Sequence, residues 1–399
     1  MKILLIGPYA PHGQVGAIRV LSLSRFLVNA GHDVSVLCLS EKSVKKMDAK
    51  GLTATIPENV KLYTYDITTN CNSTVKKTAI NAKEFRAVLR KLLLKERFDS
   101  AIVSVGPFYT LNALDELQRT KIPYILDYRD LNISSADKRK RKGVINKLKM
   151  ILSFPGMFSR EKKGLKNADY VTVVSEEMKN NLVDYFHVEK EKVFVAYNGF
   201  DDYLLSEFSN AQSDNEYFTI GYFGKLMYYN KDLTVKLFEA IDKLNSSNNT
   251  VKFLHIGPEN PAINSYFTES GLNKTGWYSC TGQMDYAEGV QRLSNCDVCA
   301  LEYAYYEGPG TKVFDYIYLN KPIIGVTKPG IPLEKLLKRF DNGFVCHDTN
   351  EVMKAIQEIR QRKIKCLIED EQPEAVIYGY SRSKQNEVFG KLLENVNRG

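Results

Sequence analysis

Short, nearly continuous apolar runs alternate with longer amphipathic stretches along the whole chain. A strand that is apolar on both faces must be covered on both faces, and helices between successive strands provide that cover. The alternation therefore predicts parallel sheets with helices on either side. In the first half, strands are expected at 3–7, 34–39, 60–65, 101–105, 123–127, 170–174 and 193–197, with helices such as 17–29 and 83–95 between them.

The same alternation starts again after a turn at 198–201 and a polar stretch at 206–216, which is a plausible linker. A chain of 399 residues is long enough for two domains of about 200 residues each. We therefore expect an α/β fold of two Rossmann-like parallel-sheet domains, 1–200 and 201–379, that face each other across a cleft. The last helical stretch, 380–399, is expected to complete the first domain. Strands of the second domain are expected at 218–224, 251–257, 298–303, 322–326 and 343–346.

The net charge of +8 is concentrated in one basic amphipathic segment, 138–166. Five consecutive basic residues, 138–142, are followed by further lysines with apolar side chains between them. Such a segment suits an anionic membrane surface or a phosphate-bearing lipid, and a solvated basic helix is the alternative. No nucleic-acid recognition motif accompanies the charge, so nucleic acid is not expected as a partner.

No apolar run is long enough to span a bilayer, and the opening run 3–6 is too short for a signal peptide. We therefore expect a cytoplasmic protein, with peripheral attachment to the inner face of the cell membrane left open. The seven cysteines are scattered, which argues against a disulfide framework. Cys296 and Cys299 form a Cys-x-x-Cys without a second ligand pair, so buried thiols are expected there instead of a zinc or redox site.

Ligands of open α/β sheets bind at the carboxyl ends of the strands, so the loops that follow strands are the places to look for function. The first loop carries Gly13 and Gly16 just before a helix, where a phosphate could approach the backbone, although a tight turn would use the same glycines. The corresponding loop of the second domain brings Lys225 and Lys231 to a strand-to-helix connection. Two positive charges there suit a diphosphate, and simple solvated lysines are the alternative.

A third loop combines two carboxylates with a helix start. Glu307 and Asp315 flank a Gly-Pro-Gly turn, and a helix is expected from Lys312 onward. The backbone N–H groups of Gly310, Thr311 and Lys312 would lie at the helix start, where anions are favoured. This arrangement suits a sugar at Glu307, a diphosphate at the amides and a ribose at Asp315.

On these residues the sequence resembles the family 4 retaining glycosyltransferases of the GT-B fold. Residues 307–315 match the family's Glu-x7-Glu element, with Asp in the second place. The resemblance implies that Glu307 binds donor-sugar hydroxyls, Asp315 binds ribose hydroxyls, Lys225 and Lys231 grip the donor diphosphate, and Gly16 approaches that diphosphate. Further matches lie at Gly-His-Asp-Val 31–34, at 168–176, at Asn-Gly-Phe-Asp 198–201, and at 311–316, which looks like a variant common among bacterial surface-polysaccharide transferases.

The acceptor side is expected in the first domain. Asp127, Arg129 and Asp130 follow a strand and resemble a bacterial subgroup of the family, and Arg19 lies one turn beyond Gly16. A His that many relatives carry near this point is not found. These four residues are candidates for lining the site of a saccharide or polyprenyl-linked acceptor, and an Arg–Asp pair that braces the loop is the alternative.

Breaking a sugar–phosphate bond leaves a charged diphosphate, whose stabilisation is the largest expected catalytic term. Lys225, Lys231 and the amides of 310–312 are expected to supply it. The Asp-x-Asp that holds a metal in many other sugar transferases is absent, so no metal and no cofactor is expected besides the nucleotide-sugar substrate. Retention of configuration is implied by the family alone. A nucleotide-sugar epimerase and a non-catalytic donor-binding scaffold protein are the alternative functions.

Overall fold

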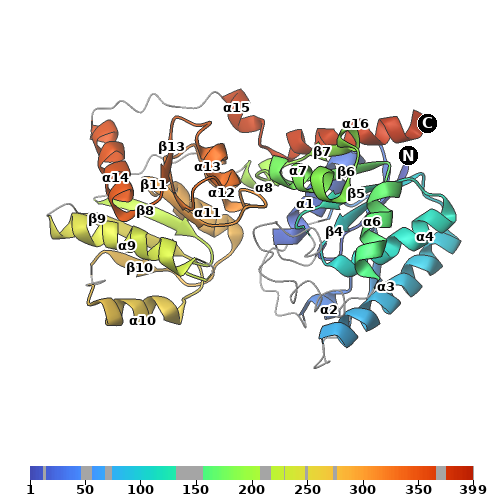
Figure 1. Ribbon diagram of the computed structural model, residues 1–399, viewed down its shortest axis with the longest axis horizontal. Helices are drawn as coiled ribbons and strands as arrows, with labels where there is room; N and C mark the ends of the chain where they lie inside the picture. The colour runs from blue at the N-terminus through green and yellow to red at the C-terminus, as the bar shows by residue number, and fades with distance from the viewer. Residues whose placement is uncertain are drawn as a thin grey trace. The chain divides into compact units, whose positions relative to one another are not determined.

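The computed structural model describes residues 1–11, 15–45, 56–67, 74–131, 156–206, 217–228, 230–247, 250–272, 276–364 and 374–398. The chain forms two compact units, Met1–Asn198 with Arg382–Gly399 and Gly199–Ser381 (Figure 1). This division lies close to the expected boundary at residue 200.

The first unit is built on a parallel sheet of seven strands in the order β3-β2-β1-β4-β5-β6-β7 among the described residues. The chain adds β2 and β3 on one side of β1, and then β4 to β7 on the other. Its strands are β1 (Lys2–Ile6), β2 (Asp33–Leu39), β3 (Lys61–Tyr65), β4 (Ser100–Val105), β5 (Tyr124–Tyr128), β6 (Tyr170–Val173) and β7 (Val193–Val195). The helices are α1 (Val15–Asn29), α2 (Glu41–Lys45), α3 (Thr74–Lys95), η1 (Phe108–Asn112), α4 (Ala113–Thr120), α6 (Met157–Asn167), α7 (Glu176–Phe186), η3 (Lys190–Lys192) and α16 (Arg382–Arg398).

Over its described residues, the second unit repeats this plan with six parallel strands in the order β10-β9-β8-β11-β12-β13. Its strands are β8 (Phe218–Phe223), β9 (Val251–Ile256), β10 (Tyr278–Cys280), β11 (Val298–Tyr303), β12 (Ile323–Thr327) and β13 (Gly343–Cys346). The helices are α8 (Asp202–Leu205), α9 (Lys231–Ser246), α10 (Pro261–Ser270), α11 (Tyr286–Ser294), α12 (Lys312–Tyr318), α13 (Pro332–Leu337), α14 (Thr349–Ile364) and α15 (Glu374–Tyr378).

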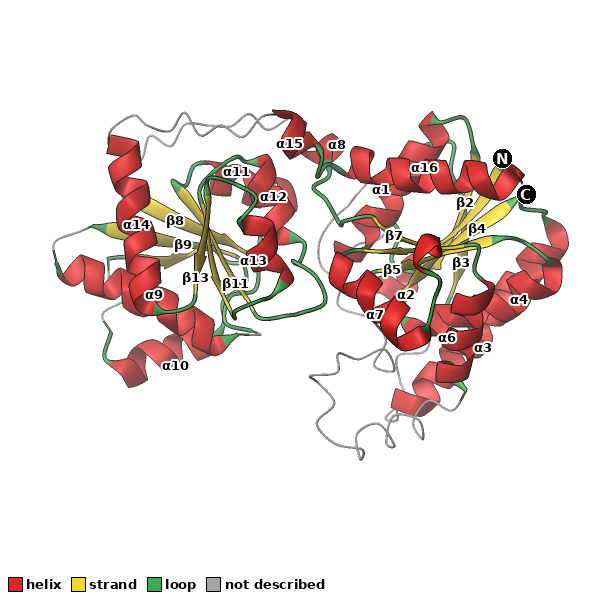
Figure 2. Cartoon of the chain, turned by 45° about the horizontal axis from the view of Figure 1, so that its top comes forward, coloured by secondary structure: helices red, strands yellow, loops and turns green. Residues whose placement is uncertain are grey.

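The strands form where the apolar runs predict them because helices cover both faces of each sheet (Figure 2). All six residues of β4 and all five of β5 are buried. The predicted fold class, two Rossmann-like α/β domains, is confirmed. The short edge strand β10 was not predicted, since its three residues are only partly buried and give no apolar run.

The C-terminal helix α16 packs on α1 and so belongs to the first unit. Phe389 of α16 is fully buried beside α1 residues of the same apolar cluster. The side-chain amide of Asn386 donates to the Ser22 hydroxyl at 3.0 Å, and both residues are buried. The last described helix of the chain therefore covers a face of the first sheet.

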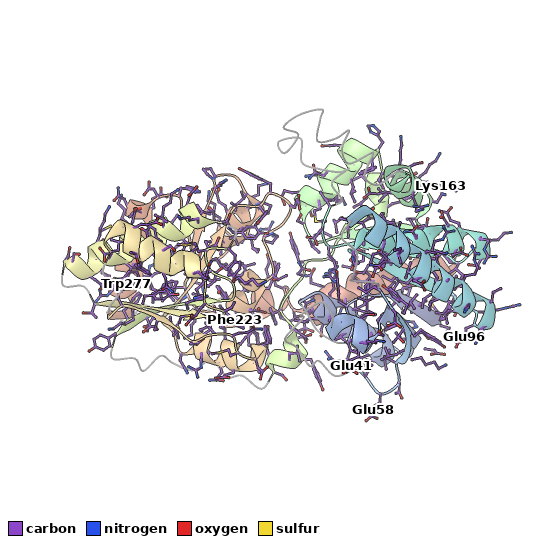
Figure 3. All side chains as sticks on the ribbon, turned by 90° about the horizontal axis from the view of Figure 1, so that it is seen from below. Glu41, Glu58, Glu96, Lys163, Phe223 and Trp277 are labelled. Atoms are coloured by element: carbon purple, nitrogen blue, oxygen red, sulfur yellow. The ribbon has the colours of Figure 1, made fainter. Side chains whose placement is uncertain are left out.

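Helix α11 approaches β8 closely at Gly289. A methyl group added at this glycine would lie well inside van der Waals contact of the Phe223 ring (Phe223 is labelled in Figure 3). That ring is also 6.0 Å from the Tyr286 ring, measured between centroids. The absence of a side chain at 289 therefore sets how near the helix lies to the sheet.

We expect Gly289→Ala to destabilise the protein by about 2 kcal/mol. Alanine favours the helix by about 1 kcal/mol, but overpacking against a rigid aromatic ring costs up to about 3 kcal/mol. The melting temperature, measured by circular dichroism, should fall by roughly 4–8 °C. Glu288→Ala, at the exposed neighbouring position, should change the stability by less than about 0.5 kcal/mol. A rise in melting temperature for Gly289→Ala would contradict this packing.

Candidate functional site

The strand order of the second unit places its site between β8 and β11. From β8 the chain runs outward to β9 and β10, and then returns to add β11, β12 and β13 on the other side. The loops that leave the carboxyl ends of β8 and β11 therefore diverge at a topological switch point, where such sheets bind ligands. These two loops, with the first turns of the helices that follow them, hold the residues of this unit that the sequence singled out.

The loop after β8 exposes two positive charges. Lys225 is exposed, and its ammonium lies 5.6 Å from the centre of the Tyr228 ring. Lys231 is also exposed and is the first residue of α9. Both lysines are therefore accessible to an anionic ligand.

The loop after β11 brings Glu307 and Asp315 to the start of α12. Glu307 is half-buried in the loop, and Asp315 lies in the first turn of the helix. The Tyr286 hydroxyl donates to Asp315 Oδ1 at 2.7 Å, which fixes the direction of that carboxylate. Gly310 has a φ of +82°, and an added side chain would meet the Tyr303 ring at 3.0 Å, so the turn requires glycine. Thr311 is the N-cap of α12.

A buried group of charged and polar side chains links these two loops. Glu302, near the end of β11, is 5% exposed and accepts from the Asn230 side-chain amide at 2.6 Å. Lys312 reaches inward from α12 and donates to the Tyr222 hydroxyl at 2.8 Å. Burial raises the pKa of Glu302 and lowers the pKa of Lys312, since each charged form loses solvation there.

Lys312 was predicted only as a backbone donor, and Glu302, Tyr222 and Tyr286 were not predicted. A carboxylate inside the apolar run 298–303 is a signal that could have drawn attention to Glu302, since a buried acid requires partners. The partners themselves carry no such signal, because Tyr222 and Lys312 are 90 residues apart in the chain.

His255 holds the loop after β8 from the side of β9. One ring nitrogen, Nε2, lies 2.8 Å from the Gly224 carbonyl oxygen, and the other, Nδ1, lies 3.0 Å from the Tyr278 hydroxyl. Burial lowers the pKa of His255, which favours the neutral ring. A neutral ring satisfies both contacts when Nε2 carries the proton and Nδ1 accepts from the tyrosine.

In the first unit, Gly16 and Arg129 are in direct contact. Arg129 Nη1 donates to the Gly16 carbonyl oxygen at 2.6 Å. A side chain at Gly16 would come within 2.5 Å of the same guanidinium and 3.1 Å of the Tyr9 ring. Asp130, the next residue in the loop, is exposed. The loops that follow β1 and β5 thus meet through this contact.

Arg19 and Asp127 form a buried ion pair. Arg19 donates from Nε and Nη2 to the two Asp127 oxygens at 2.9 and 2.8 Å, and from Nη1 to the Tyr197 carbonyl at 3.0 Å. The Thr172 hydroxyl donates to Asp127 at 2.8 Å. Burial alone would raise the pKa of Asp127, but the Arg19 charge and these hydrogen bonds outweigh it, so the pKa lies below its usual value. Such burial favours a positioning role for both residues over direct contact with an acceptor.

The predicted basic segment 138–166 lies largely outside the described residues. Its described end includes α6, where Lys162, Lys163 and Lys166 are exposed (Lys163 is labelled in Figure 3). Over the described parts of the chain, no helix is long and apolar enough to cross a membrane. In those same parts, no cluster of three or more His, Cys, Asp or Glu is arranged to hold a metal ion.

Two family models match the sequence, one in each unit. Residues 16–203 match the model of Glycosyltransferase Family 4, and residues 217–362 match that of Glycosyl transferases group 1. Comparison with curated protein sequences gives no match.

Solved structures share the fold over the whole chain at low sequence identity. Anabaena HepE in complex with UDP has a TM-score of 0.68 and 13% identity, covering 99% of this chain and 100% of that one. A glycosyltransferase from Rickettsia africae has a TM-score of 0.66 and 14% identity, with 99% and 98% covered. UDP-GlcNAc 2-epimerase from Methanocaldococcus jannaschii has a TM-score of 0.62 and 13% identity, with 99% and 100% covered.

We expect Asp127→Ala to destabilise the first unit by about 3–5 kcal/mol at pH 7, because Arg19 would keep its charge without its partner. The lowered pKa of Asp127 means that its stabilisation is present above about pH 4 and is lost as the pH falls further. Denaturant unfolding at pH 7 and pH 3 should therefore show a difference from wild type that shrinks in acid. Asp130→Ala, in the exposed loop, is the control and should unfold like wild type. An Asp127→Ala protein of unchanged stability would show that the ion pair does not brace the fold.

Proposed function

The chain belongs to the family 4 glycosyltransferases of the GT-B fold, and on that premise we propose that it transfers a sugar from a nucleotide-sugar donor to a saccharide or lipid-linked acceptor. The observation that carries the proposal is the pair of loops at the carboxyl ends of β8 and β11. They bring two exposed lysines and two carboxylates to the switch point of one sheet. Anabaena HepE, which shares this fold, is in complex with UDP, and this favours a uridine nucleotide as the first donor to test.

Each side chain has a separate role in this proposal. Lys225 and Lys231 neutralise the donor diphosphate, assisted by the first N–H groups of α12. Glu307 accepts hydrogen bonds from hydroxyls of the donor sugar. Asp315, held by the Tyr286 hydroxyl, accepts from the ribose hydroxyls.

We further propose that transfer retains the anomeric configuration. The bond between the sugar carbon and the diphosphate breaks, and the acceptor oxygen bonds to that carbon from the same face. The acceptor proton passes to the departing phosphate oxygen. Stabilisation of the departing charge by the lysines is the main catalytic contribution. At a pre-organised site of this kind it is worth roughly several kcal/mol.

The same charge balance underlies the proposal that neither a metal nor a cofactor is needed. A divalent metal neutralises the diphosphate in many other transferases. In this proposal, two lysines and a helix start carry out that neutralisation, and no step is assigned to a metal.

For the acceptor, we propose a saccharide or polyprenyl-linked saccharide of a surface-polysaccharide pathway, used at the inner face of the cell membrane. The exposed lysines of α6 and the basic residues before them favour attraction to anionic lipid. Arg129 and Asp130 are the candidates for acceptor contact. The buried ion pair of Arg19 and Asp127 is proposed to hold their loop in position.

A nucleotide-sugar epimerase is the second candidate, because an epimerase shares the fold. The two activities differ in one measurable respect, since an epimerase converts its donor without an acceptor. A scaffold protein that only binds the donor would leave it unchanged under all conditions.

The test is a binding and turnover screen of the purified protein against UDP-, GDP-, dTDP- and CMP-sugars, in EDTA and in Mg²⁺. Slow donor hydrolysis, or transfer to an added acceptor with equal rates in EDTA, is the expected result. Loss of activity in EDTA would overturn the metal-independent mechanism, and an inverted product would overturn retention. Donor epimerised in the absence of acceptor would replace the transferase proposal.

Substitutions test the assigned roles. Glu307→Ala should lower kcat/KM roughly 100-fold, as loss of one pre-organised contact does elsewhere. Lys225→Ala and Lys231→Ala should each weaken donor binding at least tenfold, because a hydrogen bond to a charged group is worth about 1.5–3 kcal/mol. Lys243→Ala, exposed at the other end of α9, and Glu358→Ala, exposed on α14, are matched controls that should leave both quantities unchanged. Wild-type kinetics in Glu307→Ala would remove that residue from the donor site.

A further inference from the structure

We propose that the buried residues Glu302 and Lys312 are positioning residues that hold Lys225 and Lys231 in place for the donor diphosphate. The inference rests on the proposed function, and it assigns a role to two side chains that contact the lysine-bearing loop from within the protein. The loop leaves β8 at Gly224 and enters α9 at Lys231.

Glu302 anchors the loop at several points. Its Oε2 accepts from the Asn230 side-chain amide at 2.6 Å, and Asn230 is the N-cap residue next to Lys231. The backbone N–H of Met227, in the middle of the loop, lies close enough to this carboxylate to lower its pKa. The Tyr222 hydroxyl lies 3.3 Å from Oε1. One carboxylate therefore contacts the middle and the end of the loop.

Lys312 and Tyr222 anchor the other end. The Lys312 ammonium lies 4.3 Å from the centre of the Tyr222 ring and donates to its hydroxyl at 2.8 Å. The Tyr222 hydroxyl oxygen accepts from Lys312, so the single hydroxyl proton can be donated to another group. The Lys225 carbonyl oxygen, at 3.0 Å, is a nearer acceptor than Glu302 Oε1, at 3.3 Å. The backbone of Lys225 is thus held through Tyr222.

The missing side chain at Gly224 leaves room for the Lys312 side chain. A side chain at Gly224 would come within 2.8 Å of Lys312 Cε and 2.9 Å of Nζ, and the φ of +114° also requires glycine. Lys312 therefore packs directly against the first residue of the loop. Since Lys312 is also the first residue of α12, this contact links the loop after β8 to the helix that carries Asp315.

The loop conformation requires such anchoring. Met227 has a φ of +61°, a left-handed value that costs energy in a residue with a side chain. Such a conformation persists only where the surroundings determine it, and here the Met227 N–H lies close to the Glu302 carboxylate. Both lysines are exposed, so the directions of their side chains depend on the backbone beneath them.

The test measures the affinity of Glu302→Gln for UDP and for UMP by calorimetry. If the screen selects another nucleotide, its diphosphate and monophosphate replace UDP and UMP. We expect the affinity for UDP to fall roughly tenfold and that for UMP to change less than threefold, since the loss is confined to the lysine contacts. In a Lys225→Ala/Lys231→Ala background the same substitution should change UDP affinity less than twofold. Equal losses in both backgrounds would overturn the proposal, because the effect would not act through the lysines.

Amide hydrogen exchange provides a readout that needs no nucleotide. The amides of 224–228 should exchange faster in Glu302→Gln than in wild type, and unchanged exchange would overturn the proposal even if UDP binding fell. If wild type binds no nucleoside diphosphate, the proposed function fails, and exchange alone decides whether Glu302 holds the loop.

A matched control is Glu334→Gln. Glu334 is a buried carboxylate of the same unit that also holds a loop amide, accepting from Gly330 N at 2.6 Å, but that loop carries neither lysine. Glu334→Gln should leave the ratio of UDP to UMP affinity and the amide exchange of 224–228 unchanged. If it changed both quantities as much as Glu302→Gln does, the proposal would be overturned. If Glu302→Gln fails to fold, Glu302→Gln/Lys312→Met removes both buried charges and should show the same loss of UDP selectivity.

Discussion

A charge inside a sheet that is covered on both faces must find its partner within the protein, because water cannot reach it. Each unit of this chain meets that constraint near the carboxyl ends of its central strands. Asp127 pairs with Arg19 in the first unit, and Glu302 lies with Lys312 and Tyr222 in the second. These groups bring together elements that are distant in the sequence. Arg19 alone contacts Asp127 of β5, the Tyr197 carbonyl after β7 and the Phe389 ring of α16.

This constraint separates buried residues that support the candidate site from exposed residues that we propose to contact a ligand. Arg19, Asp127 and Glu302 are each about 5% exposed or less, whereas Lys225, Lys231 and Asp130 are exposed on the adjoining loops. Charged residues near strand ends therefore fall into two classes with different consequences of mutation. Removal of a buried partner lowers stability first, while removal of an exposed group lowers binding first.

The fold could be predicted from the sequence because the strands are apolar on both faces. Apolar runs such as 298–303 can be identified from the local sequence alone. The sequence was also sufficient to find the loops at 224–231 and 307–315, since parallel strands present their carboxyl ends on one edge. It could not distinguish Asp127 from Asp130, two acids three residues apart, because their burial depends on Arg19, 108 residues away from Asp127. The Tyr286 contact to Asp315 and the edge strand β10 depend in the same way on long-range packing.

The two loop glycines illustrate a consequence for mutational work. Gly16 was predicted to approach a phosphate, yet its backbone is in contact with the Arg129 guanidinium. Gly224 in the second unit is likewise in contact with the Lys312 side chain. In both loops an added methyl group would first displace a cation of the protein itself. If a glycine variant lost activity, the cause could equally be displacement of Arg129 or Lys312 or exclusion of the phosphate from the loop. Substitution of the exposed lysines is therefore the direct test of phosphate contact.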